Sequence, residues 1–91
     1  MTRPQVLRLA IKYHDKLNAI GHSPVKDTSA KSLHGRMNHI MWMCLELPRL
    51  SDESKLNRWL GFIQGVLSTT TMYTIDNMRE QVSEIIKGDK E

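Results

Sequence analysis

The amino-terminal half of the chain carries a regular row of cations. Arg8, Lys12 and Lys16 recur every four residues, so a helix would place them on one face. Cations supply contacts for phosphate oxygens, and the ring of Tyr13 beside them offers a face on which a base can stack. The row predicts either a solvated helix face or a site for a nucleotide or nucleic acid. The candidate ligand-binding residues are Arg8, Lys12, Tyr13, Lys16, Lys26, Lys31 and Arg36.

The charge of the chain is divided unevenly between its halves. Residues 1–50 hold eight Lys or Arg against three Asp or Glu, a net charge of +5, whereas residues 51–91 hold five against seven, a net charge of −2. A basic half of this kind fits an anion, a nucleic acid or an acidic partner, or it docks on the acidic half of its own chain.

Catalytic and metal-binding patterns are absent from the sequence. It contains no glycine-rich phosphate loop, no nucleophile elbow and no paired carboxylates suited to acid–base chemistry. His34 and His39 are five residues apart, as are His39 and Cys44, so neither pair has the spacing of a metal site on one helix. Cys44 falls on an apolar stripe and is expected to be a core residue. We therefore expect no enzyme, no catalytic residues, no cofactor and no metal.

Composition favours one folded domain. The chain has 91 residues, of which 40% are hydrophobic and 25% charged, and this length suits one core rather than two. Its six methionines are adaptable side chains that often line protein interfaces, so a homo-oligomer is one expectation. The single cysteine and the lack of a secretory signal favour a reducing cytoplasm, and no segment reads as a membrane span.

Start and stop signals divide the chain into four helices. Thr2 and Pro4 begin the first helix, and Gly21 ends it in the left-handed conformation. Pro48 ends the second helix, and the short connection after it makes the second and third helices antiparallel. The sequence predicts an all-α bundle of four helices in one domain, 1–91, with helices two and three forming a hairpin. The expected helices cover 4–20, 28–47, 51–69 and 75–87, with 1–3 and 88–91 loose and with Thr2, Asp27 or Thr28, Ser51 and Thr74 as caps.

Each expected helix has an apolar stripe. Residues at steps of three and four share a helix face and favour burial there. The second helix is apolar over more than one face, so it is either central in the fold or shared with a partner. The stripes comprise Val6, Ala10, Tyr13, Leu17 and Ile20; Leu33, Met37, Ile40, Cys44 and Leu47; Leu56, Trp59 or Leu60, Ile63, Val66 or Leu67 and Thr70; and Ile75, Met78, Val82 and Ile85 or Ile86.

Glycines interrupt the second and third expected helices. Each glycine inside a helix costs about 1 kcal/mol relative to alanine, so Gly61 and Gly65 favour a compensating gain, most simply a close crossing by another helix. Gly35 either weakens its helix locally or permits a close contact. The residues expected for packing or for an interface are Met41, Trp42, Trp59, Gly61, Phe62 and Gly65.

Two segments resemble small proteins of tailed bacteriophages and prophages. They are the run RWLGFIQGVL at 58–67 and the run YTIDNMR at 73–79, with a similar upstream helix at 39–43. The resemblance covers roughly residues 36–80, and the chain departs from it at Ser68, where an aromatic residue is common. No settled activity belongs to that group. The resemblance implies an accessory protein that acts on the host from the host cell cytoplasm.

Two functional hypotheses follow. The first is a non-enzymatic bacteriophage accessory protein that binds and neutralises a host or antiviral-defence component, a role that the resemblance implies. The alternative is a nucleotide-binding or nucleic-acid-binding protein that uses the basic amino-terminal half, for example to sequester a signalling nucleotide or RNA. The first hypothesis predicts an exposed apolar groove or an oligomer interface. The second predicts a steep dependence of binding on salt and a dense basic patch.

Overall fold

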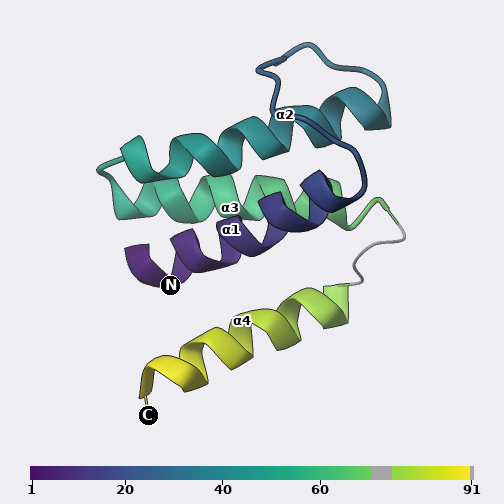
Figure 1. Ribbon diagram of the computed structural model, residues 1–91. Helices are drawn as coiled ribbons and strands as arrows, with labels where there is room; N and C mark the ends of the chain where they lie inside the picture. Colours follow the sequence, from purple (N-terminus) through teal and green to yellow (C-terminus); the bar gives the residue numbers. More distant parts are fainter. Residues whose placement is uncertain (71–74, 91) are drawn as a thin grey trace.

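The protein is an all-α bundle. The computed structural model describes the backbone of residues 1–70 and 75–90 and the side chains of 1–70 and 77–88. Within these residues there are four α-helices and no strand (Figure 1). The helices are α1 (Arg3–Ala19), α2 (Leu33–Glu46), α3 (Glu53–Leu67) and α4 (Ile75–Lys90), and a 3-10 turn, η1 (Leu47–Arg49), follows α2. The predicted fold class is confirmed.

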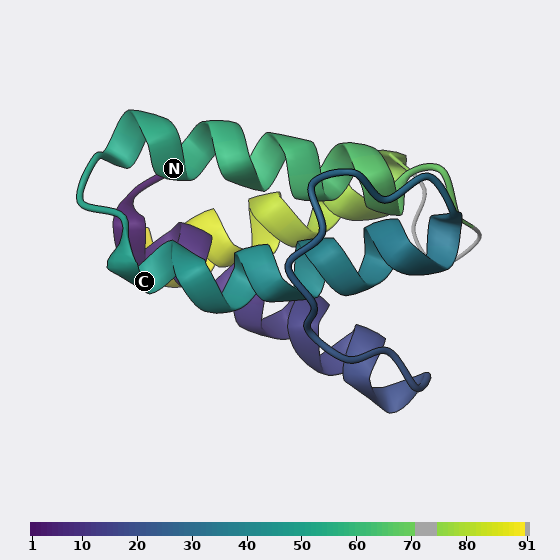
Figure 2. The same cartoon turned by 90° about the horizontal axis from the view of Figure 1, so that it is seen from above.

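α1 is the central helix of the bundle. It packs against α2, α3 and α4, while α2 and α3 run antiparallel beside each other. The view from above shows the loop of residues 20–32 crossing the outer side of α2 (Figure 2). The sequence left open whether the second helix is central or is shared with a partner. In the structure α1 takes the central position, and α2 is left with an outer side that only the loop crosses.

The ends of α1 follow the sequence signals. The Gln5 side chain accepts a hydrogen bond of 2.8 Å from the backbone N–H of Thr2, and Pro4 lies in the first turn. After Ala19, Gly21 has a φ of +96°. The N–H of Gly21 donates to Asn18 O (3.1 Å) and that of His22 to Leu17 O (3.1 Å), which is the Schellman arrangement. The left-handed ending predicted at Gly21 is confirmed.

α2 begins later than predicted. Neither Asp27 nor Thr28 caps it, because the Asp27 carboxylate instead accepts hydrogen bonds from Ser29 N (3.1 Å) and Oγ (2.9 Å) and closes a local turn. Ser32 is the cap, and its Oγ accepts a bond of 3.0 Å from Gly35 N. A Cβ at Gly35 would lie 3.1 Å from that Oγ, so this glycine permits the close contact of the cap.

The ends of α3 and α4 differ from the predicted boundaries. Asp52 caps α3 through a 2.9 Å bond from Ser54 N, in place of Ser51. α3 ends at Leu67 rather than at residue 69, and the hydroxyl of Thr69 bonds back to Val66 O (2.6 Å). α4 continues to Lys90 rather than ending at residue 87. The cap expected at Thr74 lies outside the described residues.

The amino terminus is tied down rather than loose, contrary to the prediction for residues 1–3. The Met1 amine donates to Asn57 Oδ1 (3.3 Å), and Asn57 Nδ2 donates to Met1 O (3.0 Å). The Arg3 guanidinium donates to the carbonyls of Pro48 and Leu50. These contacts join the start of the chain to α3 and to the α2–α3 connection, an attachment between distant segments that no local sequence signal indicates.

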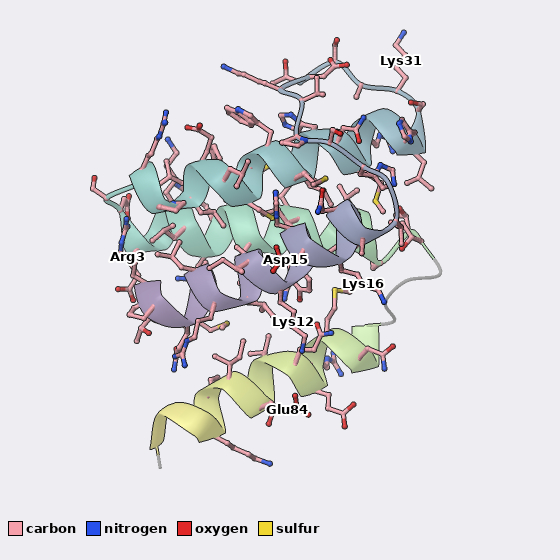
Figure 3. All side chains as sticks on the ribbon, viewed as in Figure 1. Arg3, Lys12, Asp15, Lys16, Lys31 and Glu84 are labelled. Carbon is pink, nitrogen blue, oxygen red and sulfur yellow. The ribbon has the colours of Figure 1, made fainter. Side chains whose placement is uncertain are left out.

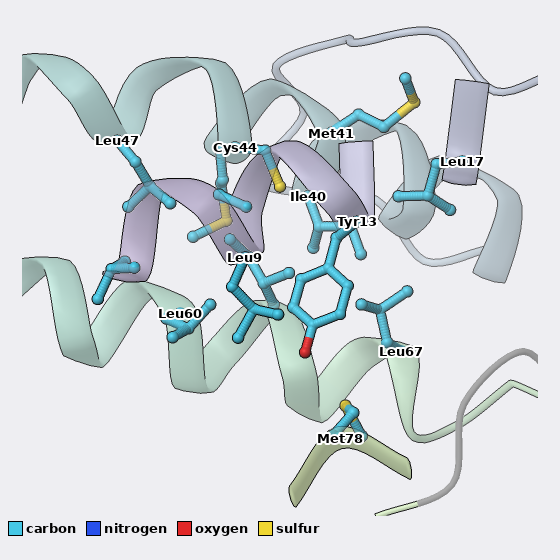
Figure 4. Packing of buried hydrophobic residues seen from close by; sticks show 14 of the residues in the cluster. Leu9, Tyr13, Leu17, Ile40, Met41, Cys44, Leu47, Leu60, Leu67 and Met78 are labelled. Atoms are coloured by element: carbon cyan, nitrogen blue, oxygen red, sulfur yellow. The ribbon is translucent and has the colours of Figure 1, made fainter. Parts of the chain in front are cut away.

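A single apolar core joins the helices. Figure 4 shows the Tyr13 ring among Leu9, Ile40 and Leu67. Leu9 is buried although it was missing from the predicted stripes. Ile20 (53% exposed) and Leu33 (47% exposed) were placed on those stripes wrongly, because Ile20 lies at the C-cap of α1 and Leu33 is the first residue of α2. The buried residues are Val6, Leu9, Ala10, Tyr13, Leu17, Met37, Ile40, Met41, Met43, Cys44, Leu47, Leu56, Leu60, Ile63, Leu67 and Met78.

Two glycine substitutions are expected to change stability in opposite directions. Gly21→Ala places a Cβ on a left-handed residue and should lower the free energy of unfolding by about 1 kcal/mol. Gly61→Ala adds a methyl group where no described heavy atom lies within 4 Å and should raise the free energy of unfolding by up to about 1 kcal/mol. Urea unfolding of both variants measures the two shifts. A loss of stability in Gly61→Ala would mean that this position is crowded.

Candidate binding groove between α2 and α3

The structure places Tyr13 in the core, away from any ligand. Its side chain is 0% exposed, and its hydroxyl accepts a 3.1 Å hydrogen bond from Gln64 Nε2 on α3. A ring buried on both faces cannot stack on a base. Tyr13 was predicted both as a ligand-binding residue and as a member of an apolar stripe. Its burial shows that it is a core residue of that stripe.

The candidate cations do not converge on one surface. Lys12 and Lys16 extend from α1 on the side of α4, while Lys31 lies on the loop at the other end of the molecule (Figure 3). Arg8 lies on α1 and donates from Nε to Pro4 O at 3.4 Å. Lys26 places its Nζ 5.2 Å from the centre of the Trp42 ring. The sequence-predicted site is therefore not assembled as one patch.

Arg36 lies apart from these residues, in a groove between α2 and α3. The groove has a volume of about 650 Å³. One wall is the α2 stripe of Arg36, His39 and Met43, which follow a helical spacing of three and four. The α3 wall and the loop complete the groove with Arg58, Trp59, Phe62, Val66, Asp27, Thr28 and Ala30.

The floor of the groove is apolar and open to solvent. Phe62 is 54% exposed, and Trp59 and Val66 are half-buried. Met43, which lines the groove from α2, is buried. An exposed aromatic ring flanked by aliphatic side chains loses favourable burial unless another surface covers it. This floor is thus suited to apolar contact with a ligand or a partner.

Two guanidinium groups border that floor. Arg36 and Arg58 are exposed, and among the described residues the ion pairs are His14 with Asp15 and Arg49 with Glu46. Neither groove guanidinium pairs with a carboxylate of the described residues. Asp27, the acidic residue of the lining, accepts hydrogen bonds from the neutral residue Ser29. Two arginines against one carboxylate leave the groove with a net positive charge beside an apolar floor.

Hydrogen bonds hold the loop wall of the groove against α2. The backbone N–H of Asp27 donates to His39 Nδ1 at 3.1 Å, which requires that nitrogen to carry no proton. The N–H of Val25 donates to Asn38 O at 3.1 Å, and that of Ser23 donates to Asn38 Oδ1 at 3.3 Å. These bonds fix the 27–30 segment as a wall.

The two tryptophans form a cluster beside the groove. The rings of His39 and Trp42 are stacked with centres 5.6 Å apart, and Trp42 lies 6.2 Å from Trp59 at a tilt of 39°. The ammonium of Lys26 lies over Trp42, and that of Lys55 lies 5.8 Å from the Trp59 ring centre. Protein groups thus already contact both indoles, which makes them poor platforms for a base.

The glycine face of α3 is open rather than crossed by a helix. A Cβ at Gly61 or Gly65 would meet no described heavy atom within 4 Å, so the close crossing predicted within the bundle is wrong for the described residues. Both glycines lie on the exposed side of α3, one turn apart and next to Phe62. Met41, from the same predicted interface set, is 0% exposed and belongs to the core.

The sequence missed several residues of the groove. His39, Met43, Arg58 and Val66 were not among the candidate ligand-binding or interface residues. The usable signal was a second helical stripe on each helix, at 36, 39 and 43 on α2 and at 59, 62 and 66 on α3. Which stripe remains exposed depends on where α1 packs, so the sequence pattern alone did not distinguish them.

Metal and thiol chemistry have little support in the described residues. These residues contain no group of three or more His, Cys, Asp or Glu side chains placed to hold a metal ion. Burial raises the pKa of the Cys44 thiol from 9.0 to about 12. The thiolate is the reactive form of cysteine, so this burial makes Cys44 a poor nucleophile.

Comparison with known proteins identifies no relative of this chain. No protein-family model, no curated protein and no solved structure matches it. No helix among the described residues is long and apolar enough to span a lipid bilayer. The resemblance at 58–67 and 73–79 remains an expectation from the sequence.

Cys44 is expected to resist alkylation while the protein is folded. At pH 8 a thiol with a pKa of about 12 has a thiolate fraction about a thousandfold below that of a thiol with a pKa of 9.0. Iodoacetamide should therefore label the native protein at least about a hundredfold more slowly than the protein in urea, as followed by mass spectrometry. Equal labelling rates in the two states would contradict burial of Cys44.

The same pKa shift predicts a loss of stability at alkaline pH. Between about pH 9 and pH 12 the unfolded chain releases the Cys44 proton, whereas the folded chain retains it. The contribution of this group to the free energy of unfolding therefore falls as the pH rises through that window. Cys44→Ala removes this contribution. The free energies of unfolding of the wild-type chain and of Cys44→Ala should therefore become more similar as the pH rises from about 9 to about 12.

Proposed function

We propose that this chain is a non-enzymatic binding protein that holds a partner protein in the α2–α3 groove. The observation that carries the proposal is the exposed Phe62 ring, 54% accessible, beside two guanidinium groups without carboxylate partners in the described chain. Aromatic and arginine side chains at the centre of an apolar patch are the residues that most often dominate protein–protein affinity. Phe62, Arg36 and Arg58 form such a combination.

A nucleotide or nucleic acid is the less supported occupant. Tyr13 is buried, and His39, Lys26 and Lys55 already contact the two indoles. Phe62 is the remaining exposed aromatic ring of the groove, and single-strand binders use several such rings along a basic channel. Lys12 and Lys16 lie on the α4 side of α1 and Lys31 lies on the opposite side of the molecule, which gives less support to a continuous basic channel.

The biological role that we propose is a bacteriophage accessory function in the host cytoplasm. The support is the resemblance of the 58–67 run, which contributes Arg58, Trp59, Phe62 and Val66 to the groove. The partner would be a host or antiviral-defence protein, neutralised by occupation of one of its surfaces. A second copy of this chain is an alternative occupant of the groove, since Gly61 and Gly65 leave the adjoining side of α3 open.

Substitution of Phe62 should abolish capture of the partner. Tagged wild-type protein, Phe62→Ala and Leu45→Ala are purified from infected host cells, and co-purifying molecules are quantified by mass spectrometry. Leu45 is a matched control, because it is 50% exposed on α2 and lies outside the groove lining. We expect one near-stoichiometric host protein, reduced at least about tenfold by Phe62→Ala and unchanged by Leu45→Ala.

Three outcomes would overturn the proposal. Equal recovery with Phe62→Ala would mean that the groove is not the binding surface. Retention of a nucleotide or RNA without any protein would favour the nucleic-acid alternative. Recovery of this chain alone, as a dimer or larger oligomer that Phe62→Ala dissociates, would assign the groove to self-association.

A further inference from the structure

We infer that the occupant of the α2–α3 groove is a single amphipathic α-helix of the partner protein, with an apolar stripe and two carboxylates about two helical turns apart. This inference rests on the proposed function, because it specifies the element of the partner that enters the groove. Three features support it: the backbone groups of the walls are already hydrogen-bonded, the floor of the groove is apolar, and the two arginines have a defined spacing.

The walls of the groove offer little backbone pairing to a ligand. The two helical walls bond their N–H and C=O groups within each helix, and the described residues contain no strand. In the loop wall at 27–30, the N–H groups of Asp27, Ser29 and Ala30 already donate to His39 Nδ1, Asp27 Oδ1 and Asp27 O. An extended peptide laid between the walls would leave its own backbone groups on that side without partners. A helical occupant satisfies its own backbone and needs only side-chain contacts, as in helix-in-groove recognition.

The dimensions of the groove fit a short helical contact. The lining runs from Arg36 to Met43 on α2 and from Arg58 to Val66 on α3. At a rise of about 1.5 Å per residue these stretches are roughly 11–12 Å long, or about two helical turns. Two turns of an amphipathic helix present apolar side chains at i, i+3 or i+4, and i+7. That stripe matches the floor of Trp59, Phe62 and Val66.

The arginines fix the charge and spacing of the occupant. Arg36 is the lining residue of α2 farthest from the α2–α3 connection, and Arg58 is the lining residue of α3 nearest to it. Because the two helices run antiparallel, the arginines lie at opposite ends of the groove, about 11–12 Å apart along its axis. Carboxylates at i and i+7 of a helix are about 10–11 Å apart along its axis, which suits this separation.

The acidic helix of a second copy does not meet these requirements. α4 carries Glu80 and Glu84 four residues apart on its exposed side. Its apolar residues Met78, Val82 and Ile85 belong to the core or pack against it. An intact α4 would thus bring carboxylates to the groove without an apolar stripe, which favours a helix from another protein.

A peptide selection tests this inference without knowledge of the partner. A displayed library of random peptides of about 16 residues, long enough for four turns, is selected against the immobilised full-length protein. We expect enrichment of peptides with apolar residues at i, i+3 or i+4, and i+7 and with two Asp or Glu residues, seven positions apart, outside that stripe. Circular dichroism of selected peptides should show an increase in helix on binding.

Charge reversal supplies the matched control. The enriched peptides should bind Arg36→Glu/Arg58→Glu at least about tenfold more weakly. Binding to Lys12→Glu/Lys16→Glu should change little, because that pair undergoes the same change of charge on α1, outside the groove. Circular dichroism confirms that both double variants remain folded.

The inference is overturned if no peptides are enriched, if enriched peptides lack the paired carboxylates, or if both double variants weaken binding equally. Enrichment of proline-rich or extended peptides would overturn it as well. The proposed function is judged separately, since loss of the cellular partner in Phe62→Ala can hold while the selection fails. In that case the groove binds a protein, but not through an acidic helix.

Discussion

The shared apolar interior of α1, α2 and α3 is the constraint on which the rest of this structure depends. Helices of 14 to 17 residues have little stability in isolation, so each must bury a stripe against its neighbours. α1 supplies the largest buried side chain, Tyr13, whose hydroxyl is satisfied by Gln64 at the edge of the core. Because α1 packs on the other helices, its position determines which faces of α2 and α3 turn inward.

The groove is a consequence of that packing. α2 and α3 each carry more apolar surface than one stripe, and the core covers only the stripes that face α1. What remains is Phe62 and its neighbours between the two helices, bordered by the loop that Asn38 and His39 hold in place. An uncovered second stripe of this kind resembles the apolar grooves used in helix-in-groove recognition, and the two arginines border it with positive charge.

Local signals in the sequence were enough for the helices but not for the site. Gly21 and Pro48 act on their own backbone, so their consequences were predictable from residue type alone. The cap of α2 was misplaced because Asp27 and Ser32 are both good caps, and in the structure the Asp27 carboxylate closes a local turn with Ser29 while Ser32 caps the helix. The anchoring of Met1 by Asn57 joins residues far apart in the chain, which periodicity cannot indicate.

The residues of the candidate site were only partly predictable from the sequence. Trp59 and Phe62 were among the residues predicted for packing or for an interface, next to the two glycines of the third helix. Arg58 was not recognised, since an exposed arginine on a helix ordinarily means only solvent. It becomes a candidate only when the fold sets it across a groove from Arg36 and beside an open aromatic ring. Conversely, Tyr13 was predicted as a ligand-binding residue, but the fold buries its side chain in the core.

Hydrogen–deuterium exchange of the chain alone and in complex with its captured partner tests whether the α2–α3 groove is the binding surface. We predict that the partner slows exchange in 36–43 and 58–66, the two helical walls of the groove, and leaves the exchange of 3–19 and 75–90 unchanged. Protection confined to α1 or α4, with both groove walls exchanging as in the free protein, would contradict it.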